Sequence, residues 1–277
     1  MIKYLATDLD GTLFYPRDRK NYLSKANLFF VQSFIDNGGK LILVSGRSVE
    51  FGERVVKKIG REATIIGYNG AVISDKGEIL KRNPIPKEDL NAILAEVCST
   101  YKMVGWMLFC DDGIYFKSPK NNRLSVLAMK VYNHSQKIYA ENMYSKESEY
   151  ENALKNKDVY KLMFMVGITQ KKQREAQDFN RILRNAYESL ECAWSNQVIE
   201  ITEKGSSKGK SILEYCKLKN INKEEVAVVG DSGNDITMFK EFPNNSFCMQ
   251  HGPASVHKYA KYTISKFEDL SRYLSKK

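Results

Sequence analysis

The 277-residue chain has few cysteines, and they follow no recognisable pattern. The five cysteines are odd in number and show no CxxC spacing. This argues against a disulfide framework and indicates ordinary thiols in a reducing compartment. Long apolar runs are also missing, since none approaches the roughly 18 residues that span a bilayer, and Lys3, Asp8 and Asp10 interrupt any signal-peptide core. We therefore expect a cytoplasmic protein.

The sequence also lacks a long run of basic residues, an internal repeat and a low-complexity segment. Its net charge of +10 and pI of about 9.2 come from basic residues spread along the whole chain. Charge alone permits an affinity for nucleic acid, anionic membrane or small anionic metabolites. A dedicated nucleic-acid arm is the less favoured of these because the basic residues do not cluster.

Strand-like and helix-like patterns alternate at both ends of the chain. The first 80 residues contain apolar strand patterns at 2–7, 40–46 and 63–73, separated by helical patterns near 24–37 and 49–59, with a hairpin-like turn at 76–77. This rhythm predicts an α/β fold with a parallel sheet covered by helices. It returns after residue 200. The middle of the chain mixes strands and helices differently, so we predict a core domain, 1–83 and 201–277, interrupted by an α+β domain, 84–200.

Polar residues follow four predicted strands at the points where they end. They are Asp8 with Asp10, Ser45, Asn69 with Gly70, and Asp231 with Asp235. In a parallel sheet, ligands bind beyond the carboxyl ends of the strands, so these groups converge on one crevice if the strands are neighbours. Clustered carboxylates require a cation, and Mg²⁺ prefers carboxylates together with a substrate phosphate. Lys208 and the turn at Ser45, Gly46 and Arg47 offer what a phosphate dianion needs.

The spacing of Asp8 and Asp10 suits phosphoryl transfer. Both can reach the crevice if the backbone turns at Leu9, and Gly11 permits that turn. One carboxylate can then attack phosphorus, while the other protonates the leaving oxygen and later activates water. The residues thus predict metal-assisted phosphoryl transfer.

Four segments resemble, in order, the motifs of the haloacid dehalogenase (HAD) superfamily: DLDGT at 8–12, SGR at 45–47, KG at 208–209 and GDSGND at 230–235. NGA at 69–71 and IEITEKGSSKGK at 199–210 resemble the Cof-type, type IIB branch. The resemblance implies a Rossmann-like core with an inserted α+β cap of the C2B type. It also implies Mg²⁺-dependent hydrolysis of small phosphomonoesters, such as sugar phosphates, through an aspartyl-phosphate intermediate.

The resemblance also implies a role for each matched residue. Asp8 is the nucleophile and Asp10 the general acid and base. Mg²⁺ is held by Asp8, the backbone carbonyl of Asp10 and Asp231, with Asp235 as a further ligand or a partner of the metal's waters. The phosphoryl group is held by a set drawn from all four motifs: Leu9, Thr12, Ser45, Gly46, Lys208 and Asn234. Arg47, Asn69 and Gly70 are substrate-binding candidates.

Several alternatives stay open on the sequence. Ser45 could cap a helix, which is compatible with binding an anion, and Arg47 could bind substrate or pair with a core acid. A stretch without acidic residues, 113–140, could attract an anionic substrate through Lys117, Lys120 and other bases. The alternative functions are a phosphomutase and a basic nucleic-acid-binding protein with a vestigial fold. We expect a small phosphorylated metabolite as partner, no nucleic acid and no membrane, for a monomer or a dimer.

Overall fold

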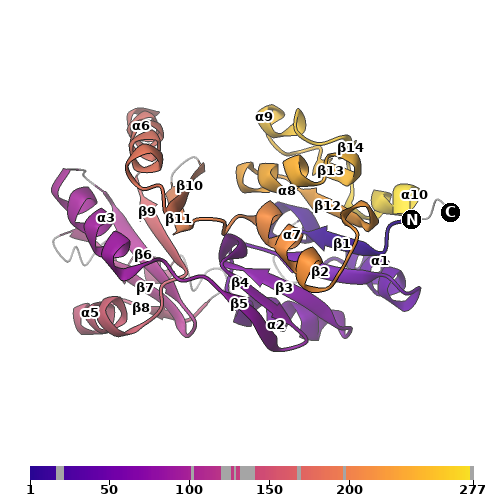
Figure 1. Cartoon of the computed structure of the whole chain (residues 1–277), viewed down its shortest axis with the longest axis horizontal. Coiled ribbons are helices and arrows are strands. Elements are labelled where there is room, and N and C mark those ends of the chain that lie inside the picture. Colours follow the sequence, from indigo (N-terminus) through magenta and orange to yellow (C-terminus); the bar gives the residue numbers. More distant parts are fainter. Residues whose placement is uncertain are drawn as a thin grey trace. The chain divides into compact units, whose positions relative to one another are not determined.

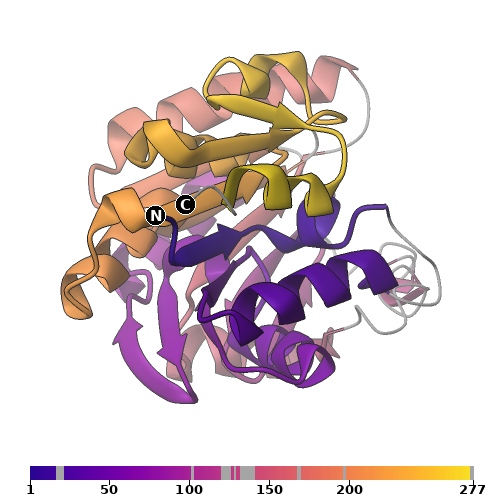
Figure 2. The same cartoon turned by 90° about the vertical axis from the view of Figure 1, so that its right-hand side faces the viewer.

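The computed structural model describes residues 1–16, 22–100, 103–119, 126–127, 129–131, 141–166, 170–195 and 198–274. These residues form two compact units, one of Met1–Lys81 and Ser207–Lys277 and the other of Arg82–Ser206 (Figure 1). The first unit combines the indigo-to-purple start of the chain with its orange-to-yellow end, two stretches far apart in sequence (Figure 2).

The first unit is built on a sheet of eight strands in the order β14-β13-β12-β1-β2-β3-β4-β5. The strands are β1 (Tyr4–Thr7), β2 (Lys40–Val44), β3 (Ala63–Gly67), β4 (Val72–Asp75), β5 (Glu78–Arg82), β12 (Val226–Gly230), β13 (Ser246–Met249) and β14 (Tyr262–Ile264). From β14 to β3 all neighbours are parallel, and β4 runs antiparallel to β3. The central strands are buried along nearly their whole length, as strands covered on both faces should be.

Helices cover both faces of this sheet. They are α1 (Lys25–Asp36), α2 (Val49–Ile59), α7 (Lys208–Leu218), α8 (Ile236–Glu241), α9 (Ala254–His257) and α10 (Ser271–Leu274). On one face, α7 and α8 bury Ile212 and Met238 against Ile42 and Ile66. On the opposite face, Gly52 of α2 packs so closely on Ile65 of β3 that a methyl group there would lie 2.5 Å from its side chain. Successive side chains of β3 point to opposite faces of the sheet, so Ile66 packs with α7 and α8 and Ile65 packs against α2.

Side-chain caps and turn residues set the limits of these elements. The hydroxyls of Ser24, Ser48 and Ser207 accept hydrogen bonds from the first turns of α1, α2 and α7. Lys76 and Gly77 form the tight turn between β4 and β5, with φ of +54° and +82°. This turn lies where the sequence predicts it.

The prediction of one strand across 63–73 is wrong. The chain forms β3, turns at Tyr68–Gly70 and returns as the antiparallel β4. The apolar pattern continues through the turn because Tyr68 is itself buried, which hides the break from a reading of hydrophobicity alone.

The second unit is a six-stranded sheet in the order β10-β11-β9-β6-β7-β8. Its elements are α3 (Lys87–Thr100), β6 (Gly105–Cys110), β7 (Gly113–Lys117), β8 (Met143–Tyr144), α5 (Glu147–Asn156), β9 (Lys161–Met165), α6 (Gln170–Ala186), β10 (Leu190–Ser195) and β11 (Val198–Glu203). Except for β7 with β8, its neighbours are antiparallel. One apolar cluster joins this sheet to α3, α5 and α6, and the Trp106 indole donates to the Tyr150 hydroxyl at 2.9 Å.

The predicted fold class is therefore confirmed: an α/β core with a mostly parallel central sheet and an inserted α+β unit. All five cysteines are free thiols, and four of them are buried. Within the described ranges, no helix has both the length and the apolar character needed to cross a membrane.

Candidate active site

Four neighbouring parallel strands of the first unit end at the predicted site residues. Asp8 follows β1, Ser45 follows β2, Asn69 lies in the turn after β3, and Asp231 follows β12. Because β12, β1, β2 and β3 are parallel and adjacent, their carboxyl ends meet at one edge of the sheet. The structure thus brings these four residues together.

The segment Leu9–Leu13 after β1 forms an irregular helical turn, which we call the catalytic loop. Its interior departs from helical geometry at Asp10 (φ −75°, ψ 113°) and at Gly11 (φ +86°). A Cβ on Gly11 would lie 2.6 Å from Oδ2 of Asp231, so the loop passes close to that carboxylate and requires glycine there. The Thr12 hydroxyl donates to Oδ1 of Asp231 at 3.0 Å, which ties the loop to the end of β12.

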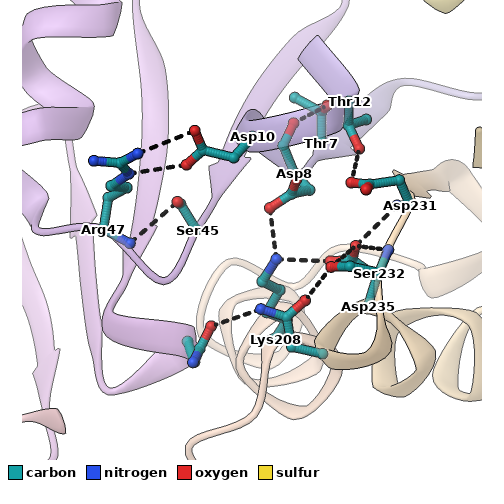
Figure 3. Close-up of polar contacts among 12 residues, drawn as sticks. Thr7, Asp8, Asp10, Thr12, Ser45, Arg47, Lys208, Asp231, Ser232 and Asp235 are labelled. Carbon is teal, nitrogen blue, oxygen red and sulfur yellow. Dashed lines mark hydrogen bonds and ion pairs between the residues drawn. The ribbon is translucent and has the colours of Figure 1, made fainter. Parts of the chain in front are cut away.

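Lys208 lies between two buried carboxylates. Its Nζ is 2.6 Å from Oδ1 of Asp8 and 2.7 Å from Oδ1 of Asp235 (Figure 3). Lys208 is the first residue of α7, and Ser207 caps that helix. Burial alone would lower the pKa of Lys208, but Asp235 and Asp8 raise it above its ordinary value. The side chain is thus a fixed ammonium ion.

Asp235 uses both carboxylate oxygens within the protein. Oδ1 accepts from Lys208, and Oδ2 accepts from the backbone N–H groups of Asp231 and Ser232, each at 2.9 Å (Figure 3). Gly230 makes room for this arrangement, because a Cβ there would lie 2.5 Å from Cγ of Asp235. Asp235 therefore positions Lys208 and the backbone that carries Asp231.

Asp8, Asp231 and Asp235 can each direct a carboxylate oxygen to a common point, with the oxygens within 4.8 Å of one another. Burial raises the pKa of Asp8 well above its usual range, and the neighbouring aspartates add to this while Lys208 opposes it. Burial, followed by the charge of Asp235, raises the pKa of Asp231 to about 6. Three carboxylates face one ammonium ion, which leaves an excess of two negative charges when all are ionised.

One oxygen in this group also lacks a partner. Oδ2 of Asp8 is buried and has no hydrogen-bond partner among the described residues. A buried, unpaired carboxylate oxygen costs free energy unless a cation or a donor satisfies it. The donor set and its excess charge therefore fit a divalent cation with oxygen ligands.

The Asp10 side chain is held by Arg47 in a two-bonded ion pair. Nε of Arg47 is 2.9 Å from Oδ2 of Asp10, and the terminal nitrogen Nη2 is 3.1 Å from Oδ1. Figure 3 shows the Asp10 carboxylate directed at Arg47, whereas Asp8 is directed at Lys208. The Asp10 side chain is 44% exposed and that of Arg47 23% exposed. On the sequence alone, Arg47 could bind substrate or pair with a core acid. In the structure it pairs with Asp10, an acid of the site itself.

Ser45 forms a turn but does not cap the following helix. Its hydroxyl accepts from the backbone N–H of Arg47 at 3.1 Å, across Gly46, whereas the cap of α2 is Ser48, which accepts from Phe51. The helix-cap alternative for Ser45 is thus wrong, because α2 begins three residues later than that alternative requires. The Ser45 side chain is buried at the end of β2.

The turn Tyr68–Gly70 has positive φ at all three residues, +52°, +58° and +108°. For Tyr68 and Asn69 this conformation is uncommon and costs about 1 kcal/mol or more each. The turn is fixed by backbone bonds from Tyr68 to the carbonyl of Arg47 and from Asn69 to that of Ser45, both 2.9 Å. Asn69 Oδ1 accepts from the Asn234 amide at 3.2 Å, so it contacts a predicted phosphate-binding residue directly.

Some residues at the site carry no signal in the sequence. Asn27 of α1 donates to the carbonyls of Leu13 and Tyr15, both at 2.8 Å, and so holds the chain just after the catalytic loop. The His251 ring stacks on Tyr15 beside that loop. An asparagine in a helix and a histidine in a loop are common, and only the packing reveals their neighbours.

The basic stretch of the second unit does not present Lys117 as a free cation. Its Nζ pairs with Glu147 at 2.7 Å and with Glu151 at 2.6 Å. Lys120, Arg123 and Lys137 lie outside the described residues. The expected attraction of substrate by Lys117 therefore has to compete with two glutamates.

A family model described as haloacid dehalogenase-like hydrolase matches residues 5–271. The chain belongs to this family. The match covers both stretches of the core and the inserted unit. It confirms the HAD resemblance of the four motifs and the Cof-type resemblance of the segments 69–71 and 199–210.

Relatives agree with this assignment. A phosphoglycolate phosphatase of Methanoculleus marisnigri is 24% identical over 87% of this chain and 81% of its own length. A pyridoxal phosphate phosphatase of Escherichia coli is 24% identical over 86% of this chain and 84% of its own. The solved structure of a sugar phosphatase of HAD subclass IIB superposes with a TM-score of 0.76 at 21% identity, covering 98% of each chain. Together with the family, these phosphatase relatives confirm the prediction of a phosphoric monoester hydrolase.

Proposed function

We propose that this protein is a Mg²⁺-dependent phosphatase that hydrolyses small phosphorylated metabolites through an aspartyl-phosphate on Asp8. The observation that carries the proposal is the environment of Asp8. One oxygen is held by Lys208, the other is buried without a partner among the described residues, and Asp231 and Asp235 lie beside it. A carboxylate placed in this way can act as a nucleophile, because its orientation is set and one oxygen is uncommitted.

Mg²⁺ fits the acidic group on the charge and the donor atoms described above. Asp8, Asp231 and the backbone carbonyl of Asp10 would hold the ion, while the oxygens of Asp235 are already engaged by Lys208, Asp231 and Ser232. When bound, Mg²⁺ neutralises the carboxylates and polarises a phosphoryl oxygen.

The reaction that these residues support has two displacements. A carboxylate oxygen of Asp8 attacks phosphorus, the bond from phosphorus to the ester oxygen breaks, and Asp10 gives its proton to that oxygen as the alcohol leaves. A water molecule then attacks the phosphorus of the aspartyl-phosphate and gives a proton to Asp10, and the Asp8 carboxylate leaves as phosphate is released. Asp10 thus serves as acid and then as base.

The ion pair with Arg47 bears on the role of Asp10. In the structure both Asp10 oxygens bond to Arg47, so its carboxylate has to leave this pair before it can transfer a proton beside Asp8. Arg47 would then be released toward a substrate phosphate or another anionic group, for which its planar guanidinium is suited. Arg47 would therefore pair with Asp10 first and bind the substrate after that pair has opened.

The transferring phosphoryl group would be held by the residues around the edge of the sheet. Lys208 supplies a charge, and the Ser45 hydroxyl, the Asn234 amide and the backbone from Leu9 to Thr12, with that of Gly46, supply donors. Asn234 is oriented from two sides, because its Oδ1 accepts from the Ser232 hydroxyl at 2.7 Å and its Nδ2 donates to Asn69. Asn69 would act indirectly, by orienting the Asn234 amide. Gly70 would act by allowing the turn that places Asn69.

The substrate class follows from the relatives and from the charge of the chain. Relatives are named for phosphoglycolate and for pyridoxal phosphate, both small anionic phosphomonoesters. A net charge of +10 favours such substrates. We place the protein in the cytoplasm as a catalyst of small-metabolite dephosphorylation without a nucleic-acid or membrane partner.

The test is phosphate release from a panel of phosphorylated metabolites, with Mg²⁺ and with a chelator, ranked by kcat/KM. We expect release that needs Mg²⁺ and is abolished in Asp8→Asn. Asp75→Asn is the matched control, because Asp75 is a partly buried acid of the same unit that pairs with Lys219, away from the site. Return of the phosphoryl group to the same sugar without release would indicate a mutase, and full activity in Asp8→Asn would reject the proposal.

A further inference from the structure

Asn27 is a buried polar residue in the first turn of α1, and it is only 1% exposed. Its backbone N–H donates to the hydroxyl of Ser24, the cap of this helix, at 3.1 Å. Because the cap is made through the backbone, the Asn27 side-chain amide can contact another segment. That segment is the stretch of chain where the catalytic loop ends.

Both hydrogens of the Asn27 amide are donated to the backbone there. Nδ2 lies 2.8 Å from the carbonyl oxygen of Leu13 and 2.8 Å from that of Tyr15. Leu13 is the last residue of the catalytic loop. A side-chain amide has two N–H donors, so this one is fully used. Asn27 therefore ties α1 to the end of the catalytic loop with two hydrogen bonds.

The loop residue that Asn27 holds is bonded in turn to Asp8. The N–H of Leu13 donates to the Asp8 carbonyl at 3.2 Å, and the next N–H, that of Phe14, donates to the Leu9 carbonyl at 3.0 Å. Leu13 thus bonds to Asp8 through its N–H and to Asn27 through its carbonyl. A shift of Leu13 would move the backbone that carries the Asp8 carboxylate.

The other end of the Asn27 amide has no partner among the described residues. Its Oδ1 is buried and accepts no hydrogen bond from them. Exchanging the two ends of the amide would be worse, since Oδ1 would then face two carbonyl oxygens. A buried amide oxygen without a donor costs free energy, which opposes the gain from the two donated bonds. Asn27 therefore adds less net stability than its two bonds suggest, and its effect on the loop can be separated from its effect on folding.

We propose that Asn27 is a positioning residue that fixes the catalytic loop and, through Leu13, the backbone of Asp8. It is not a catalytic residue, because its amide bonds to backbone carbonyls rather than to a reacting group. Its effect on turnover rests on the proposed function, whereas its hold on the loop does not. Displacement of a reacting group by about 1 Å can cost about 100-fold in rate, so a loosened loop should lower kcat.

Asn27→Leu is the test variant, because leucine keeps the branched shape of asparagine and removes both donors and the unpaired oxygen. Asn27→Gln is milder, since it keeps both donors on a side chain one methylene longer. Gln32→Leu is the matched control: Gln32 lies in the same helix, and its amide donates to the carbonyl of Ile59, the last residue of α2, at 2.8 Å. We expect Asn27→Leu to lower kcat about tenfold with KM little changed. Asn27→Gln should lose less, and Gln32→Leu should keep the wild-type kcat.

Hydrogen exchange of the Leu13 and Phe14 amides in the metal-free, full-length protein gives a readout without turnover. Both amides should exchange faster in Asn27→Leu than in the wild type, while the amides of β2 keep their rates, which marks local rather than global opening. In Gln32→Leu the two loop amides should exchange as in the wild type.

Wild-type exchange and wild-type kcat in Asn27→Leu would overturn the inference. So would a loss of kcat that follows the melting temperature equally in Asn27→Leu and Gln32→Leu, because that would be a purely structural effect. Faster exchange of the loop amides in a protein that hydrolyses no phosphomonoester would support the hold of Asn27 on the loop and reject the proposed function.

Discussion

Lys208 is the residue on which the charge balance of the site depends. It is buried between Asp8 and Asp235, and its removal leaves two buried carboxylates without a counter-charge. We expect Lys208→Met to lower the free energy of unfolding by about 3 kcal/mol in Mg²⁺-free buffer, since breaking a buried ion pair is strongly destabilising. Activity should fall at least about 100-fold, because an electrostatic contact to the transferring group is lost.

Lys217→Met is the control for this prediction, because Lys217 is exposed in the last turn of the same helix. It should change the free energy of unfolding by less than about 0.5 kcal/mol. Denaturant unfolding and phosphate release measure both variants. Equal stability and activity of the two variants would show that Lys208 is an ordinary solvated lysine.

Asp231 gives the stability of the metal-free protein a distinct dependence on pH. Its folded pKa of about 6 lies above the ordinary value of 3.8, so the folded state binds this proton more tightly than the unfolded chain. The contribution to stability is fully present below pH 3.8 and is lost as the pH rises through about 6.

The difference in unfolding free energy between wild type and Asp231→Asn reports this effect, because carboxylates remote from Asp231 titrate equally in both. The charge of Asp231 also helps to raise the pKa of Asp8, and the loss of that contribution changes the difference in the same direction. Measured with a chelator, wild type minus Asp231→Asn should become less favourable from about pH 4.5 to about pH 7.5. Mg²⁺ should stabilise the wild type more at the higher pH, since metal binding requires the ionised carboxylate. A difference that grows with pH would contradict this assignment.

At the scale of elements, two turns with positive φ differ in how closely their glycines are packed. A Cβ on Gly70 would lie 2.4 Å from Oγ of Ser211 and 2.7 Å from the carbonyl oxygen of Ser207, whereas nothing lies within 4 Å of the same position on Gly77. Gly77→Ala should therefore cost about 1 kcal/mol, the cost of its left-handed backbone alone. Gly70→Ala should cost about 3 kcal/mol or more and also lower activity, because the turn holds Asn69 against Asn234.

Denaturant unfolding of the two variants decides this prediction. If Gly70→Ala and Gly77→Ala lose equal stability, the close packing of the Tyr68–Gly70 turn against α7 has no energetic weight.

Elements with strong apolar periods could be predicted from the sequence. The spacing near 49–59 matches α2, the apolar runs of β1 and β2 lie where they are expected, and β12 ends just before Asp231 as predicted. The break between β3 and β4 could not be predicted, because buried Tyr68 continues the apolar pattern through a turn that tertiary hydrogen bonds stabilise. Ser45 and Ser48 are both plausible caps in sequence, and only the start of α2 distinguishes them.

At the site, the sequence could identify the carboxylates, Ser45, Lys208 and Asn234 because the motifs carry these residue types at strand and helix ends. Their chemical roles remain proposals. The ion pair of Asp10 with Arg47 and the contacts of Asn27 and His251 depend on side-chain directions that no local pattern encodes. These contacts arise when segments far apart in sequence meet at one edge of the sheet.

At the scale of the whole molecule, the net charge of +10 accompanies a proposed preference for small anionic substrates. Such an attraction acts on encounter and is screened by salt. We expect kcat/KM for a phosphomonoester to fall several-fold from about 0.01 M to about 0.15 M ionic strength, with kcat nearly constant. A kcat/KM that is independent of ionic strength would show that the basic surface plays no part in substrate capture.

The insertion of one compact unit between two stretches of the other is also a property of the whole chain. In the structure the second unit begins at Arg82 and ends at Ser206, and the first unit resumes at Ser207. We predict that the inserted unit selects the substrate. The boundaries at 84 and 200, expected from the change in strand and helix pattern, also stay predictions. The residues proposed as catalytic all belong to the first unit, so exchange of residues in the second unit should alter the ranking of substrates more than the chemical step.

The central claim is that Asp8 carries the phosphoryl group during turnover, and the most direct test is to find it there. Asp10→Asn lacks both the acid that protonates the leaving oxygen and the base that activates water. It should therefore accumulate the intermediate when mixed with Mg²⁺ and an aryl phosphate, whose leaving group departs without protonation. Peptide mass spectrometry after an acid quench should then locate one phosphoryl group on Asp8, and none in Asp8→Asn. A phosphoryl group on another residue, or phosphate release by Asp8→Asn at the wild-type rate, would contradict the account.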